Sequence, residues 1–286
     1  PAKIFPLLMG LIETIAIVGD ITATNLFGNY IDSFGWDIAN ITVIVFCFIL
    51  FICACSYAVF HKKIVHTPVK KTLRAVLKEF LSLFKNRAFI CVLIYAFFTW
   101  FSIQTLAGFW GRDYFMIMHH YSDIESLHLM GVYWIGLLVS SPLIGFLVSK
   151  IGYHRLIIII LATIGLIAQS VMCIPILFNY QALIVIAIST GISASGIVIA
   201  FSIASDILAP QLKGTGIALL NTAIIFGGVA GQQIFKYIIL SFNIGDYIDI
   251  SVNGSFYTAL LTFPISTLIA LIAIILIVKK TKKTIK

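Results

Sequence analysis

Two carboxylates stand seven residues apart near the start of the chain, Glu13 and Asp20 in the apolar stretch "GLIETIAIVGDITATN". If this stretch is helical, seven residues make about two turns, so the two side chains share one helix face. Charged groups among apolar residues are expensive to bury and are by default functional. A proton-accepting carboxylate or a contact for a cationic group would fit both positions. The structural alternative is an ion pair with another helix.

Three further polar residues lie near the ends of apolar stretches: Arg112, Gln232 and Lys236. Contact with an anionic or polar solute is the functional interpretation of all three. For Lys236 the alternative is a long side chain that reaches back to water, because it lies about one turn from the end of its stretch.

A second charged group occurs around the segment "GFLVSKIGYHRL", which contains Lys150 and Arg155. Asp206 ends a later apolar stretch on the same side of the predicted membrane. An ion pair between Asp206 and these cations could form a latch. Such a pair stabilises little when exposed and more when partly buried. The alternative is that Lys150 and Arg155 only orient the chain in the membrane.

The elements that must position these residues are membrane-spanning helices. Of the 286 residues, 60% are hydrophobic and 10% are charged, whereas about a quarter are charged in a typical soluble domain. A run of about 18 or more apolar residues can cross the bilayer as a helix. The sequence therefore predicts an all-α integral membrane protein with eight spans, at residues 5–27, 39–60, 88–110, 127–148, 156–178, 182–207, 214–240 and 256–278.

Basic residues are distributed very unequally between the predicted loops. If the first span runs outward, the inner segments 61–87, 149–155, 208–213 and the tail after Val278 hold 16 of the 19 Lys and Arg residues, and the outer loops hold only Arg112. Positive loops face the cytoplasm. The sequence thus predicts a multi-pass protein of the cell's inner membrane with both termini in the cytoplasm, and a basic cytoplasmic tail at 279–286.

The longest inner segment, 61–87, contains a further helix pattern. In "TLRAVLKEFLSLFKN" the apolar residues recur at helical spacing, and Arg74, Lys78 and Lys85 take the opposite face. This pattern predicts an amphipathic helix lying on the inner membrane surface. The segment divides the chain into two spans at 1–60 and six spans at 88–278.

Three motifs, in this order, resemble the major facilitator superfamily. The stretch that ends in Phe34-Gly35-Trp36 is similar to the fifth helix of that family and its outer turn. "GFLVSKIGYHRL" resembles its inner-loop motif, with Ser149 where the family usually has an acidic residue. "DILAPQLKGTGIALLN" resembles its inner loop before the eleventh helix.

The resemblance implies that the chain is the C-terminal eight-helix portion of a twelve-helix bundle. It would contain the last two helices of the N-terminal half, a linker and a complete C-terminal half. The expected partners are a small-molecule substrate, the lipid bilayer and the four helices missing from the N-terminal half. The resemblance also implies secondary active transport by alternating access, and Asp20 and Glu13 suggest proton symport. A family latch would join Asp206 to Lys150 or Arg155.

A membrane channel or receptor, and an integral membrane enzyme, are the alternative functions. The sequence has no HExxH, GxSxG or phosphate-loop motif, and it predicts no cofactor and no metal site. The net charge of +8 arises mainly from the loops, which fits membrane orientation better than binding to nucleic acid. We therefore expect a carrier and not an enzyme.

Overall fold

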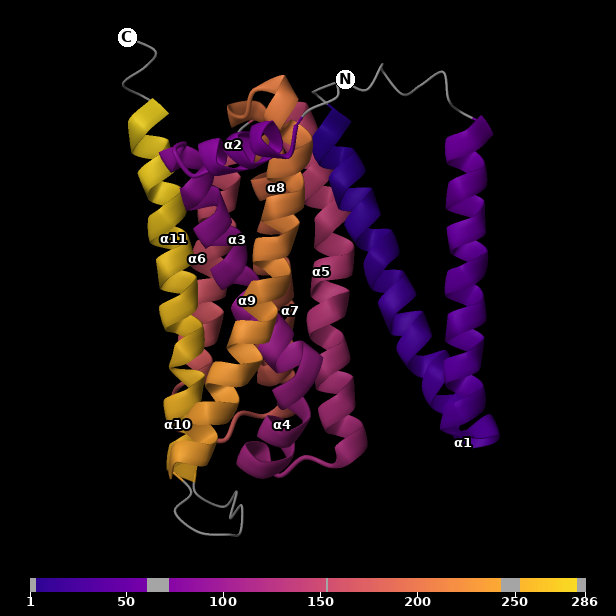
Figure 1. Ribbon diagram of the computed structural model, residues 1–286. Coiled ribbons are helices and arrows are strands. Elements are labelled where there is room, and N and C mark those ends of the chain that lie inside the picture. The colour runs from indigo at the N-terminus through magenta and orange to yellow at the C-terminus, as the bar shows by residue number, and fades with distance from the viewer. Residues whose placement is uncertain (1–3, 61–71, 153, 243–252, 282–286) are drawn as a thin grey trace. The chain divides into compact units, whose positions relative to one another are not determined.

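The computed structural model describes residues 4–60, 72–152, 154–242 and 253–281. These residues form two compact units, of which one contains Pro1–Ile15 and Glu79–Lys286 and the other contains Ala16–Lys78. Within the described residues every regular element is a helix (Figure 1). The all-α prediction is confirmed.

The helices follow one another along the chain. Some spans combine several of them, as in Arg87–His119, which contains α3, η2 and α4. Their bounds are α1 Phe5–Phe60, α2 Leu73–Leu83, α3 Arg87–Thr105, η2 Leu106–Trp110, α4 Gly111–His119, α5 Asp123–Ile151, α6 His154–Met172, α7 Tyr180–Ala194, α8 Gly196–Ile207, η3 Pro210–Leu212, α9 Lys213–Phe242, α10 Asn253–Leu260 and α11 Thr262–Thr281.

Among the described residues, seven helices are long and apolar enough to cross a membrane. Six of them match the six spans predicted after the linker, and the seventh, Ser33–Tyr57, contains most of the second predicted span. The first predicted span corresponds to a shorter apolar helix, Phe5–Gly19. The structure thus supports the predicted arrangement, with seven full-length spans where the sequence predicted eight.

Gly35 interrupts α1 at the predicted outer turn. Its backbone angles are φ 79° and ψ 166°, which place it in a region that glycine adopts without a steric penalty. The hydroxyls of Tyr30 and Thr42 lie 3.1 Å apart on the two sides of this turn. The Phe34-Gly35-Trp36 motif therefore forms a break between two helical segments.

The amphipathic helix predicted in the linker is α2. Leu83 near its end is fully buried, whereas Leu77 and Leu81 are exposed. The next helix is capped by Asn86, whose side-chain oxygen accepts hydrogen bonds from the backbone N–H groups of Ala88 and Phe89. An α-helix begins with unpaired N–H groups, so this cap fixes where α3 starts.

Helix α3 packs against both α9 and α11, and glycines of α9 allow its close approach. A Cβ atom on Gly231 would lie 2.5 Å from the Phe101 carbonyl oxygen, and one on Gly227 would clash with the Phe97 carbonyl. Small residues commonly bring membrane helices this close. We call the two ends of the unit that contains Glu79–Lys286 the α2 end and the α4 end. Helix α5 begins at the α4 end and ends at the α2 end (Figure 1).

Candidate functional site

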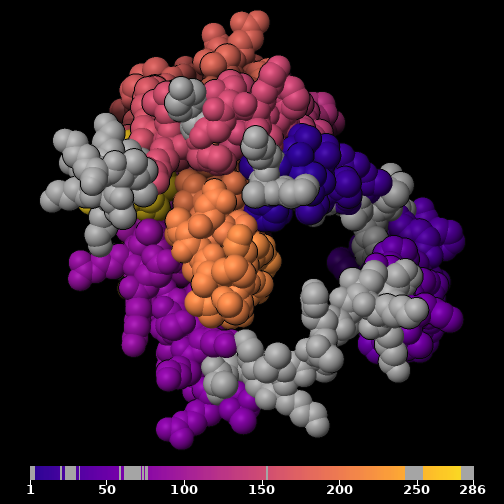
Figure 2. Space-filling model, turned by 90° about the horizontal axis from the view of Figure 1, so that it is seen from above, coloured from indigo at the N-terminus to yellow at the C-terminus, as the bar shows by residue number. Residues whose placement is uncertain are grey.

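The first turns of α1 pack tightly on α5 at the α2 end. Figure 2 looks onto this end, where the start of α1 (indigo) lies against α5 (pink). A Cβ atom on Gly145 would lie 2.6 Å from the Pro6 carbonyl oxygen, and one on Gly10 would clash with the Ser141 carbonyl. Both glycines are therefore required for this approach of the two backbones. The contact joins residues of the first and fourth predicted spans.

A hydrogen bond of Ser149 reinforces this contact. The backbone N–H of Leu7, in the first turn of α1, donates to the Ser149 hydroxyl at 3.2 Å, and that hydroxyl donates to the Gly145 carbonyl at 2.7 Å. A first-turn N–H has no partner within its own helix. Ser149 stands where an acidic residue is usual in the family motif. Its hydroxyl thus gives a first-turn N–H of α1 a hydrogen-bond acceptor from another helix.

The three latch residues lie at the same end. Lys150 and Asp206 line one polar pocket of about 310 Å³, together with Ser149 and Ser202. The Lys150 ammonium lies 5.7 Å from the centre of the Phe146 ring. Among the described side chains, no ion pair joins Asp206 to Lys150 or Arg155. The fold brings Lys150 and Asp206 to one pocket without an ion pair between them, and Arg155 does not line this pocket.

The two carboxylates of α1 are described to different extents. The Glu13 residue is half-buried in the part of α1 that packs with the six-helix unit. Asp20 lies within the helical backbone of α1, but its side chain is outside the described residues.

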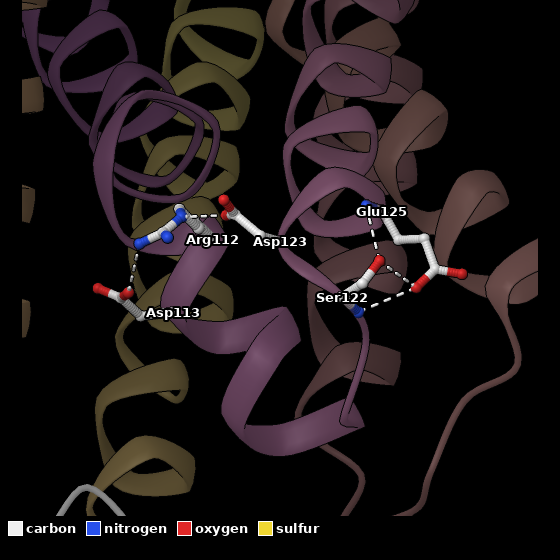
Figure 3. A network of polar contacts seen from close by, with 5 residues as sticks. All are labelled: Arg112, Asp113, Ser122, Asp123 and Glu125. Carbon is white, nitrogen blue, oxygen red and sulfur yellow. Dashed lines mark hydrogen bonds and ion pairs between the residues drawn. The ribbon is translucent and has the colours of Figure 1, made fainter.

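Arg112 is paired at the α4 end. Its guanidinium donates from Nε to an Asp123 carboxylate oxygen and lies 3.9 Å from the Asp113 carboxylate (Figure 3). Close by, Ser122 caps α5, and the Glu125 carboxylate accepts hydrogen bonds from the Ser122 N–H and hydroxyl at 2.9 and 2.6 Å. The charge of Arg112 is therefore partly satisfied within the protein, at an exposed position.

Gln232 and Lys236 both belong to α9 near the α4 end. The backbone carbonyl of Gln232 accepts a hydrogen bond of 3.4 Å from the indole N–H of Trp110. Lys236 is exposed and lines a shallow hollow of about 400 Å³ together with Gln233 and Tyr237. This position suits a solute contact and a side chain reaching to water equally well.

Sequence reasoning missed a cluster around Gln104 in α3. The rings of Trp100 and Trp134 lie 6.4 Å apart, and the indole N–H of Trp134 donates to the Ala107 carbonyl at 3.2 Å. Ala107 belongs to the π-helical turn η2, a kind of distortion that is frequent at functional sites. The sequence signal was a glutamine inside an apolar stretch, four residues after a tryptophan.

The contact between α1 and α5 gives a first testable prediction. We expect Gly145→Leu to force α1 away from α5 and to lower stability by about 1–3 kcal/mol, the usual cost of overpacking. The control is Gly131→Leu on the same helix, where a Cβ atom would meet nothing within 4 Å. The measurement is the thermal unfolding midpoint of the purified protein. Equal midpoints for the two variants would contradict this interpretation of Gly145.

Comparison with known proteins agrees with this architecture. No curated protein matches the chain with significant similarity. A family model described as "Major Facilitator Superfamily" matches residues 1–232, which is most of the chain. The match includes α1 with its Gly35 turn, the inner-loop motif around Lys150 and the segment that begins at Asp206. The chain therefore belongs to the Major Facilitator Superfamily of membrane transporters.

Proposed function

We propose that the protein is a secondary active transporter that moves a small solute by alternating access, coupled to protons as a symporter. The observation that carries this proposal is the close contact of α1 with α5, through Gly10, Gly145 and the Leu7–Ser149 hydrogen bond. At the α2 end it joins a helix of the predicted N-terminal half to one of the predicted C-terminal half. Repeat-related halves that rock about a midplane site would open and close such a contact.

The distribution of basic residues supports an orientation for this mechanism. Among the described residues of this unit, the α2 end carries Lys85, Arg87, Lys150, Arg155 and Lys213, whereas Arg112 and Lys236 lie near the α4 end, so the α2 end would face the cytoplasm. The first turn of α1 and the last turn of α11 also lie at this end (Figure 1). We infer an inner-membrane protein with both termini in the cytoplasm, whose cytoplasmic side is closed in this conformer.

Each group of candidate residues has a distinct role in the proposal. Lys150, Arg155 and Asp206 form the cytoplasmic gate, which tightens when an ion pair closes across the pocket at the α2 end. Glu13 and Asp20 carry the coupled proton. Arg112, Gln232 and Lys236 contact the solute near the α4 end.

The variant Asp206→Asn tests both the proposed cytoplasmic gate and alternating access. In a background without native cysteines, Ser202→Cys reports access to the pocket at the α2 end, where Ser202 is buried in this conformer. Gln233→Cys, exposed on α9, reports access near the α4 end. We expect Asp206→Asn to raise the labelling rate at position 202 severalfold and to lower it at position 233, because loss of the carboxylate weakens closure of one end.

A matched control separates this effect from a general change in charge. Asp37→Asn removes an exposed carboxylate from α1 and should leave both labelling rates unchanged. A channel would let both reporters react at once, so parallel changes at the two positions would contradict alternating access. Unchanged labelling in Asp206→Asn would remove Asp206 from the gate.

A further inference from the structure

The Gln104 side chain lies at membrane depth without a protein partner. Gln104 is 16 residues beyond the start of its predicted span at Ala88, or about 24 Å along a helix. Its residue is half-buried, and no hydrogen bond to its amide exists among the described residues. A side-chain amide has two donors and two acceptor sites to satisfy. In a membrane span such a group faces the bundle interior or a water-filled path.

Two glycines make room for this side chain. A Cβ atom on Gly108 would lie 2.6 Å from the Gln104 amide nitrogen, and one on Gly228 would lie 2.8 Å from its Cγ. Gly228 belongs to α9 and also lies under Trp100, whose Cδ1 would be 3.3 Å from the added Cβ. The amide is thus held between α3 and α9, beside the indole of Trp100.

Trp134 lies beside Trp100, with 6.4 Å between the ring centres. Trp134 comes from α5, and its indole N–H is already bonded to the Ala107 carbonyl in the π-helical turn. The Trp134 ring is therefore oriented by the protein, whereas the amide of Gln104 remains available. We name Trp100, Gln104 and Trp134 the Gln104 site.

The helix segments that carry the Gln104 site contain no charged residue. The sequence has no Asp, Glu, Lys or Arg between Arg87 and Arg112, or between Glu125 and Lys150. On α9 none occurs between Lys213 and Lys236. An ionised group bound here would lose its hydration without a counter-charge, which is strongly unfavourable. Indole faces and an amide instead suit a group that combines C–H surface with hydroxyls.

We propose that the Gln104 site binds an uncharged, hydroxyl-bearing part of the transported solute, such as a sugar, polyol or nucleoside ring. This inference rests on the proposed transport function and specifies its substrate class. The Gln104 amide exchanges hydrogen bonds with solute hydroxyls while Trp100 and Trp134 cover the apolar face of the ring. The carboxylates of α1 are then left for the coupled proton.

The test uses the protein purified in detergent. Its thermal unfolding midpoint is measured with uncharged probes (pentoses, hexoses, polyols and nucleosides) and with charged probes (sugar phosphates, sugar acids and dicarboxylates). We expect an uncharged probe to raise the midpoint, and Gln104→Met to weaken its apparent Kd roughly tenfold by removing the amide. Gln181→Met, at an exposed position of α7, should leave that Kd unchanged.

Trp100→Leu is the second variant, because it removes a ring and leaves the amide; it should also weaken the uncharged probe. Stabilisation by charged probes alone, no stabilisation by any uncharged probe, or an unchanged Kd in Gln104→Met would overturn the inference. The reciprocal labelling of positions 202 and 233 requires no solute. It can therefore succeed when the Gln104 site fails, which separates this inference from the proposed function.

Discussion

A disulfide between positions 7 and 149 is expected to stop solute exchange completely. The Leu7 backbone nitrogen lies 3.2 Å from the Ser149 hydroxyl, so helices α1 and α5 approach closely enough to test a pair of cysteines at these positions. In a background without the five native cysteines, Leu7→Cys with Ser149→Cys should cross-link under mild oxidation. The bond would hold α1 on α5 and keep the α2 end closed, whereas transport requires this end to open in every cycle.

The measurement is exchange of labelled solute across proteoliposomes before oxidation, after oxidation and after reduction. We expect exchange to disappear with the oxidant and to return with the reductant. The matched controls are the single variants Leu7→Cys and Ser149→Cys in the same background. Neither can form the 7–149 disulfide, so the oxidant should leave their exchange unchanged. A cross-linked 7–149 protein that still exchanges solute would contradict the proposed opening at this contact.

Asp20→Asn is expected to abolish uphill uptake while exchange continues. Asparagine has nearly the same shape as aspartate but cannot bind and release a proton, so a symporter with this change loses its coupling. The solute can still cross in both directions, because the binding site and the two gates are intact. Glu13→Gln should have the same effect if Glu13, and not Asp20, carries the proton.

Uphill uptake is measured in vesicles with an imposed pH gradient, and exchange is measured without one. Asp37→Asn is the control, since Asp37 is an exposed carboxylate of the same helix that is assigned no part in coupling. Survival of uphill uptake in Asp20→Asn would exclude this residue from coupling. Loss of exchange as well as uptake would indicate a structural ion pair, which was the alternative drawn from the sequence.

Much of the architecture was determined by the sequence alone. The long apolar runs required spanning helices, because backbone polar groups in a bilayer must be bonded within the segment. The apolar spacing after Thr72 predicted α2, and the Phe34-Gly35-Trp36 turn predicted the break in α1. These features depend on residues that are neighbours along the chain. Composition and local spacing therefore record them directly.

The contacts that suggest a mechanism were decided only by the tertiary structure. Leu7 and Ser149 are 142 positions apart, and nothing near either residue in the sequence indicates the other. The same holds for Trp100 and Trp134, which meet where α5 packs against the π-helical turn that follows α3. The sequence predicted Arg112 as a solute contact, and only the fold placed Asp123 beside it. Pairing and close approach depend on how helices pack, and an apolar helix face is compatible with many neighbours until packing selects one.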